Sequence, residues 1–386
     1  MENIGSRTYC LRENVLILPF DNCYDDRFVL SCGTRHWDVS KKIKIIADII
    51  SIPRTFDEIL DELDNQEGHM TKAEVGMILS DYFDANGWVE DIECTTEAKS
   101  TVTLWGRFTI IPKETVKRLL FLKILFSKPV VLVLLVLITA VNVFIVLENG
   151  VNINIVNKMN LRNIILFIMI NASVVIFHEI GHAVALLKYG FFPGRIGGAF
   201  YMCKPVMFTD ANSCWQLNRL QRQCVNFGGM YFQLIMATII AIVAYLNHSS
   251  NIVDLVFYSY FSMFANFNVF IKADGYWMLS DFLGVSNLHD FIFNIIFNRK
   301  ECNCSSVKKA IIYLYTVMFA GMVALIAYIM TVNFCTSAAN LYRLYNGENV
   351  RPDKTIYSVM VIILSCIFVV RMTKKFPNFI RKIKKS

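Results

Sequence analysis

Long apolar segments constrain this chain more than any other feature. The first covers residues 129–147 and contains no Asp, Glu, Lys or Arg. A helix needs about 20 predominantly apolar residues to cross the hydrocarbon core of a bilayer. Five further apolar segments follow, at residues 164–187, 227–246, 252–271, 310–332 and 356–370. We therefore expect a mainly α, polytopic membrane protein with about six transmembrane helices.

The amino-acid composition supports a lipid environment. Hydrophobic residues make up 55% of the chain and charged residues 18%, whereas soluble domains carry about 25% charged residues. This balance excludes a disordered chain, a fibrous protein and an enzyme that is soluble throughout. The net charge of +7 comes from Lys and Arg residues that cluster beside the apolar segments. An anionic membrane surface explains this charge better than nucleic acid does.

The distribution of Lys and Arg also predicts an orientation, because cytoplasmic loops of membrane proteins carry an excess of both. They are frequent before the first apolar segment, between the second and third, after the fourth, and in the C-terminal tail. The intervening loops carry fewer, except the loop with Arg343, Arg351 and Lys354. We expect a multi-pass protein in the plasma membrane of a prokaryote, with the N- and C-termini in the cytoplasm.

The front of the chain, residues 1–105, has the composition of a small soluble domain. Two strand candidates are followed by three segments with apolar residues at helical spacing. These five segments are residues 15–18, 28–30, 39–50, 55–63 and 71–83. Thr55 with Glu58, and Thr71 with Glu74, have the spacing of capping boxes at helix starts. The pattern predicts a small α+β, winged-helix-like cytoplasmic domain.

The partner of this front domain can be judged from its charges. Asp and Glu crowd its second helical segment, whereas phosphate recognition needs clustered Lys and Arg. We therefore expect no nucleic-acid partner and favour a peptide, with a purely structural domain as the alternative. A basic, amphipathic linker at residues 106–128 follows, and residues 129–386 form the six-span membrane domain.

The second apolar segment contains His-Glu-Ile-Gly-His at residues 178–182. Ionisable residues inside a membrane helix are costly and indicate function. Residues four positions apart share a helix face, so His178 and His182 can bind one metal ion. Glu179 lies near enough to act as a general base on water. We predict one zinc ion per chain with Glu179 as the catalytic residue; a buried polar network is the alternative.

A catalytic zinc site needs a third protein ligand and an open position. Asp274 follows the fourth apolar segment, which is expected to run in the same direction as the second and so to bring Asp274 to the depth of the histidines. Gly275 would let the backbone turn close to the metal. The alternative for Asp274 is an N-cap of the next helix. Asn268 is predicted to contact the substrate or an oxyanion, or else to form an interhelical hydrogen bond.

These motifs resemble the site-2 protease family of intramembrane zinc metalloproteases. The closer likeness is to a branch of peptide zinc metalloproteases found beside genes for ribosomal peptides. The residues that carry the resemblance are His178, Glu179, His182, Phe208-Thr209-Asp210, Trp215, Asp274-Gly275-Tyr276 and Leu279-Ser280-Asp281-Phe282-Leu283-Gly284. The resemblance covers most of residues 105–290. Val269 stands where the branch has proline, so the local kink that presents the aspartate is expected to differ.

The resemblance also implies how peptides are bound. The front domain resembles, more weakly, the PqqD-like peptide-recognition element of peptide-modifying enzymes, which implies that a strand edge captures a leader peptide by β-augmentation. In site-2 protease relatives the region of residues 191–208 forms a membrane-embedded hairpin beside the active site, which implies a place for an extended substrate strand. A cytoplasmic loop is the alternative for this segment.

We therefore expect a zinc-dependent intramembrane endopeptidase that hydrolyses peptide bonds of a membrane-associated or ribosomally synthesised precursor peptide. Its expected partners are a peptide or membrane-protein substrate, the lipid bilayer, and proteins that modify or export peptides. Two other functions stay open from the residues alone. One is a peptide exporter or immunity factor that keeps a structural metal site, and the other is a membrane-anchored regulator.

Overall fold

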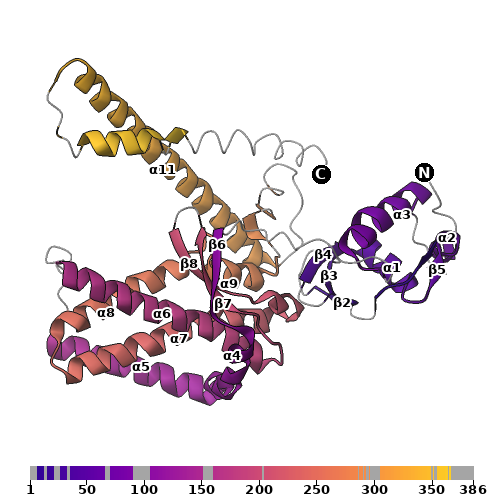
Figure 1. Ribbon diagram of the computed structural model, residues 1–386, viewed down its shortest axis with the longest axis horizontal. Helices are drawn as coiled ribbons and strands as arrows, with labels where there is room; N and C mark the ends of the chain where they lie inside the picture. The colour runs from indigo at the N-terminus through magenta and orange to yellow at the C-terminus, as the bar shows by residue number, and fades with distance from the viewer. Residues whose placement is uncertain are drawn as a thin grey trace. The chain divides into compact units, whose positions relative to one another are not determined.

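The computed structural model describes most of the chain. The described residues are 7–12, 15–20, 27–32, 35–65, 70–89, 105–150, 160–201, 204–285, 287–289, 291–292, 295, 305–348, 351, 354–363 and 365–366. The chain divides into two compact units, Met1–Ser286 and Asn287–Ser386. The protein is mainly helical, with a small strand-rich region near its N-terminus (Figure 1).

The front domain begins with strands and continues with helices. Its strands are β1 (Thr8–Tyr9), β2 (Val15–Pro19), β3 (Arg27–Cys32), β4 (Arg35–Ser40) and β5 (Arg54–Thr55). Its helices are α1 (Lys41–Ile49), α2 (Phe56–Asn65), α3 (Lys72–Ile78) and the π-helical η1 (Leu79–Asp84). The sheet β2-β3-β4 is an antiparallel meander, and β1 pairs with β5. The three-stranded sheet thus precedes the helices, and a winged-helix arrangement is not confirmed.

The core of the front domain follows from the helical spacing of its apolar residues. Leu30 of the sheet packs with Ile46, Ile59 and Val75 of the three helices, and all four are fully buried. The predicted capping box at Thr71 is confirmed, with reciprocal hydrogen bonds to the N3 glutamate. The first helix begins two residues later than the pattern suggests, because residues 39 and 40 pair with β3 as the end of β4.

The segment at residues 106–128 is more than a basic linker. It forms β6 (Trp105–Ile111), α4 (Lys113–Arg118) and the 3-10 helix η2 (Leu119–Phe126). β6 pairs with β7 (Ile196–Tyr201), which pairs with β8 (Lys204–Thr209) in a sheet of order β6-β7-β8. The segment alone gave no sign of this strand, because its pairing partner lies far along the sequence.

Among the described residues, four helices are long and apolar enough to cross a membrane. They are α5 (Lys128–Asn149), α6 (Leu161–Lys188), α7 (Arg219–Leu246) and α11 (Ser306–Tyr345). The fourth predicted span is largely helical as α8 (Ser250–Asn266), but this helix has 17 residues and ends before residue 271. The sixth is represented by a shorter helix, Lys354–Ile363, and residues 367–370 lie outside the described residues. The number of spans and the orientation of the termini therefore stay predictions.

Helices α6 and α7 form the centre of the first unit, with α8 packed against both and α5 against α7 (Figure 1). In the most apolar 18-residue stretch of α7, half of the residues are buried, against 6% in the corresponding stretch of α5. Helix α7 is therefore the inner helix and α5 a peripheral one. The α6–α7 contact is close because glycines meet there. A Cβ atom on Gly181 would lie 2.1 Å from the carbonyl oxygen of Gly228. This approach brings the backbone of α7 next to the His-Glu-Ile-Gly-His segment.

Candidate metal centre

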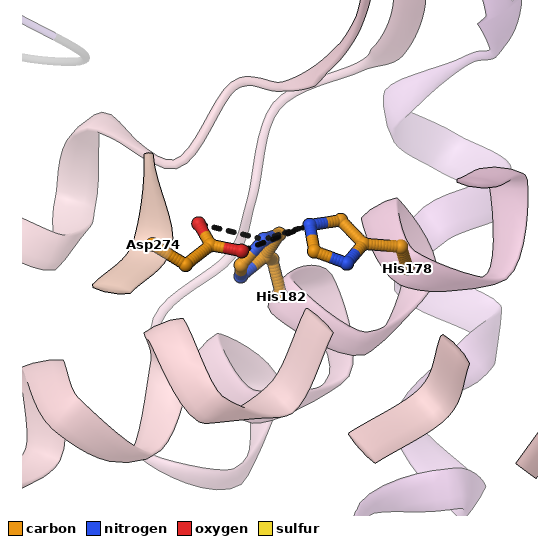
Figure 2. Close-up of side chains that lie close together, drawn as sticks. All are labelled: His178, His182 and Asp274. Atoms are coloured by element: carbon orange, nitrogen blue, oxygen red, sulfur yellow. Dashed lines mark hydrogen bonds and ion pairs between the residues drawn. The ribbon is translucent and has the colours of Figure 1, made fainter. Parts of the chain in front are cut away.

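Two segments far apart in the sequence bring three potential metal ligands together (Figure 2). His178 and His182 lie on α6, and Asp274 is the first residue of α9 (Asp274–Leu283). One ligand atom from each residue lies within 4.8 Å of the other two. The Nε2 atoms of the histidines are 3.0 Å apart, and the carboxylate oxygens of Asp274 lie 3.0 Å from His178 Nε2 and 3.6 Å from His182 Nε2. The predicted ligand set therefore converges.

The hydrogen bonds behind the two imidazoles determine which nitrogens face Asp274 without a proton. His182 Nδ1 lies 2.8 Å from the carbonyl oxygen of Val225, so Nδ1–H is the donor. His178 Nδ1 lies 3.1 Å from Gln233 Oε1 and donates to it. In neutral imidazole only one nitrogen carries hydrogen. Both Nε2 atoms are then lone-pair donors that point toward each other and toward the carboxylate.

This arrangement of lone pairs can hold a cation. Two imidazole lone pairs and a carboxylate repel one another unless a proton or a metal ion lies between them. Asp274 Oδ2 is buried and has no hydrogen-bond partner. Ligand atoms about 2.0–2.1 Å from one tetrahedral ion lie roughly 3.3 Å apart, which matches the 3.0 to 3.6 Å separations. The residues therefore fit a divalent metal, and this donor set suits zinc.

The loop between α8 and α9 presents Asp274. Residue 273 is the N-cap of α9, and no side chain caps the helix there, so the N-cap alternative for Asp274 does not hold. Gly275 permits the loop to fold back closely, because a Cβ atom on it would lie 2.5 Å from the backbone of Phe267. The aspartate is thus fixed by a tight backbone contact and faces the histidines.

The predicted general base lies beside these ligands and is held by a residue that the sequence did not single out. Glu179 is buried, and its Oε2 accepts a hydrogen bond of 2.7 Å from Thr209 Oγ1. Thr209 is the last residue of β8 and lies within the Phe-Thr-Asp segment of the resemblance. Only that short match could have indicated it, because threonine by itself carries no metal or base signal.

Two further residues position the ligands. Gln233 of α7 accepts from His178 Nδ1 and also from Asn266 Nδ2, at 3.3 Å. Gly229 of α7 leaves space for the imidazoles, since a Cβ atom there would lie 2.5 Å from His182 Nε2. In the sequence, a glutamine and a glycine within an apolar segment are the signals that could have indicated these two residues. Both belong to the central helix α7, which faces α6.

The metal ligands and Glu179 line a cavity of about 330 Å³. Its walls include aromatic rings and a buried ion pair in which Arg222 Nε donates to Asp281 Oδ1 over 2.6 Å. The thiol of Cys214 also lines the cavity. Burial raises the pKa of Cys214 to about 12, with the charge of Asp281 adding to the rise. This thiol therefore stays protonated at neutral pH and is a poor metal ligand or nucleophile.

Asn268 is not among the residues that line this cavity. Its Oδ1 accepts a hydrogen bond of 2.8 Å from the backbone N–H of Phe270, a local turn contact within the loop before α9. Its neighbour Asn266 reaches the metal ligands instead, through Gln233. A role of Asn268 in substrate or oxyanion binding stays a prediction.

No family model matches the chain, and no curated protein or solved structure matches it. The resemblance to site-2 proteases therefore rests on the motif residues and on nothing broader.

Proposed function

We propose that this protein is a zinc-dependent endopeptidase that cleaves peptide bonds inside the membrane or at its face. One observation carries the proposal: three lone-pair donors from two distant segments converge beside a buried carboxylate on the wall of a cavity. The long apolar helices support a membrane location. A structural metal site does not account for the neighbouring Glu179. Burial of a carboxylate costs free energy, which favours a functional role for this residue.

His178, His182 and Asp274 would hold the zinc ion, which when bound supplies a Lewis acid for the scissile carbonyl and for water. Glu179 accepts a proton from the attacking water and delivers it to the leaving amine. The hydrogen bond that His182 Nδ1–H donates to the carbonyl oxygen of Val225 keeps that imidazole in the tautomer that presents Nε2.

The substrate class we propose is an extended peptide, from a ribosomally made precursor or a membrane-associated protein. β8 is the last strand in the order β6-β7-β8, and its final residue contacts Glu179. A peptide that adds to this strand by β-augmentation would lie beside the cavity. In the front domain, β2 is likewise the outer strand of its meander, which supports capture of a leader peptide there.

The test compares wild type with Glu179→Gln. Both proteins are reconstituted in vesicles of phosphatidylglycerol and phosphatidylethanolamine, loaded with zinc, and offered a quenched-fluorescence library of apolar peptides. We expect wild type to cleave part of the library and Glu179→Gln to lose at least about 100-fold in rate while it keeps one zinc ion per chain.

His182→Ala serves as the metal control in the same assay. It should lose both zinc, measured by metal analysis, and cleavage. Cleavage by Glu179→Gln at the wild-type rate would overturn the proposed mechanism. If Glu179→Gln still supports export of a peptide or protection from one, with no cleavage by wild type, the exporter or immunity function replaces the protease.

A further inference from the structure

The hydroxyl group of Thr209 contacts Glu179 at two atoms. Thr209 Oγ1 lies 2.7 Å from Glu179 Oε2 and 2.9 Å from the backbone carbonyl oxygen of the same residue. A hydroxyl carries one hydrogen, so these two oxygens share it. The short distance to Oε2 is typical of an O–H donor to a carboxylate. The contact therefore fixes both the side chain of the base and its place on α6.

The position of this hydroxyl is determined by the sheet. Thr209 is paired with Ile196 in the β7–β8 ladder, and Ile196 is fully buried. Directly after Thr209, the N–H of Asp210 donates to the carbonyl of Arg195 over 3.0 Å, and the N–H of Gly194 donates to the carbonyl of Asp210 over 2.8 Å. Backbone hydrogen bonds thus hold the strand on both sides of the threonine.

We propose that Thr209 is a positioning residue for the general base. Its hydroxyl holds Oε2 of Glu179 in one orientation, so that Oε1 is the oxygen that receives the proton from water. This inference rests on the proposed function. A misplacement of about 1 Å can cost on the order of 100-fold in rate, and a glutamate has three side-chain torsions through which to move. The fixed hydroxyl removes that freedom from one oxygen.

The position of β8 thereby affects the base directly. Strand β8 is also the strand on which we propose that an extended peptide adds. A substrate that orders β8 would order Glu179 through the same hydroxyl, with no contact of its own to the carboxylate. The orientation of the base then depends on β8 through one hydrogen bond.

The experiment uses two substitutions at Thr209 and one matched control. Thr209→Val keeps the shape and removes the hydroxyl, and Thr209→Ser keeps the hydroxyl. Thr139→Val is the control, because within the described part of the chain the hydroxyl of Thr139 donates to the carbonyl oxygen of Leu135 on its own helix α5, at 2.8 Å, and to no other residue. The probe is a library peptide that wild type cleaves and Glu179→Gln does not, measured in the same vesicles.

We expect Thr209→Val to lower kcat about 10- to 100-fold with KM and zinc content unchanged. Thr209→Ser should restore kcat to within about threefold of wild type, and Thr139→Val should not change it. A second readout needs no substrate: the carboxylate stretch of Glu179, obtained as the infrared difference between wild type and Glu179→Gln, should shift in Thr209→Val and not in Thr209→Ser.

Three results would overturn the inference. One is a kcat of Thr209→Val within twofold of wild type. Another is a Thr209→Ser variant as slow as Thr209→Val, which would assign the effect to shape. The third is an unshifted carboxylate band. Each of these results leaves the proposed protease function standing, provided that Glu179→Gln is inactive in the same series. Failure of the Thr209 inference can thus be told apart from failure of the protease proposal.

Discussion

The front domain and the metal centre are held together by different kinds of contact. In the front domain, apolar side chains such as Leu30 and Ile59 are fully buried against one another. At the metal centre, α6 and α7 meet through Gly181 and Gly228, and hydrogen bonds to side chains such as Gln233, which accepts from His178, orient the candidate ligands. The first region is built by burial of apolar area and the second by close backbone approach and polar contacts.

Water around the front domain and lipid around the apolar helices, the location proposed above, would account for the difference. In water, removing apolar surface from solvent is the main driving force for packing. Between helices in lipid this force is absent, because the lipid tails are as apolar as leucine, so small residues and interhelical hydrogen bonds determine the packing. The same substitution should therefore have opposite or unequal effects in the two regions.

The largest expected effect is in the front-domain core. Ile59→Ala removes a fully buried side chain of α2 and should cost about 2–5 kcal/mol of front-domain stability. Hydrogen exchange of residues 35–65 in the full-length protein measures it. Zinc affinity should stay at the wild-type value, since Ile59 belongs to the front-domain core cluster, whose described members include none of the candidate ligands. A parallel loss of zinc would show that the two regions fold as one.

A glycine substitution in α7 should have the opposite result: weaker zinc binding and an unchanged front domain. Gly229→Ala places a methyl group 2.5 Å from His182 Nε2 and should cost about 1–3 kcal/mol through displaced side chains, measured as weaker zinc binding by competition with a chelator. Gly321→Ala on α11 is the control, because a Cβ atom there has no neighbour within 4 Å. Equal zinc affinities for the two variants would contradict the close packing at the site.

The smallest effect is a gain in stability. Gly76 lies within α3 with open space around a Cβ atom. Gly76→Ala should stabilise the front domain by about 0.5–1 kcal/mol, because alanine loses less conformational freedom in a helix. The shift in hydrogen exchange of residues 70–89 measures it. The same change from glycine to alanine thus raises stability in the front domain and lowers metal affinity in α7; a loss of stability at Gly76 would contradict this comparison.

Local patterns were enough to place most elements. The apolar segments predicted the long helices α5, α6, α7 and α11, and helical spacing predicted the three helices of the front domain, because periodicity and span length depend on neighbouring residues. The ligands were also within reach, since the histidines are four residues apart on one helix and Asp274 stood beside Gly275 in a polar break. Their convergence at 3.0 to 3.6 Å agrees with that prediction.

The contacts that hold Glu179 and the candidate ligands in place could not be predicted from local sequence patterns. The strand β6 in the linker segment, the hydrogen bond from Thr209 to Glu179, and the space left by Gly229 all join segments that are distant in the chain. A strand without its partner, a single threonine and a single glycine carry no pattern of their own. Composition and spacing therefore predicted helices apolar enough to cross a membrane and a cluster that could hold a metal. Only the folded arrangement shows which contacts orient Glu179 and the three clustered side chains, because orientation depends on contacts between segments that are distant in the sequence.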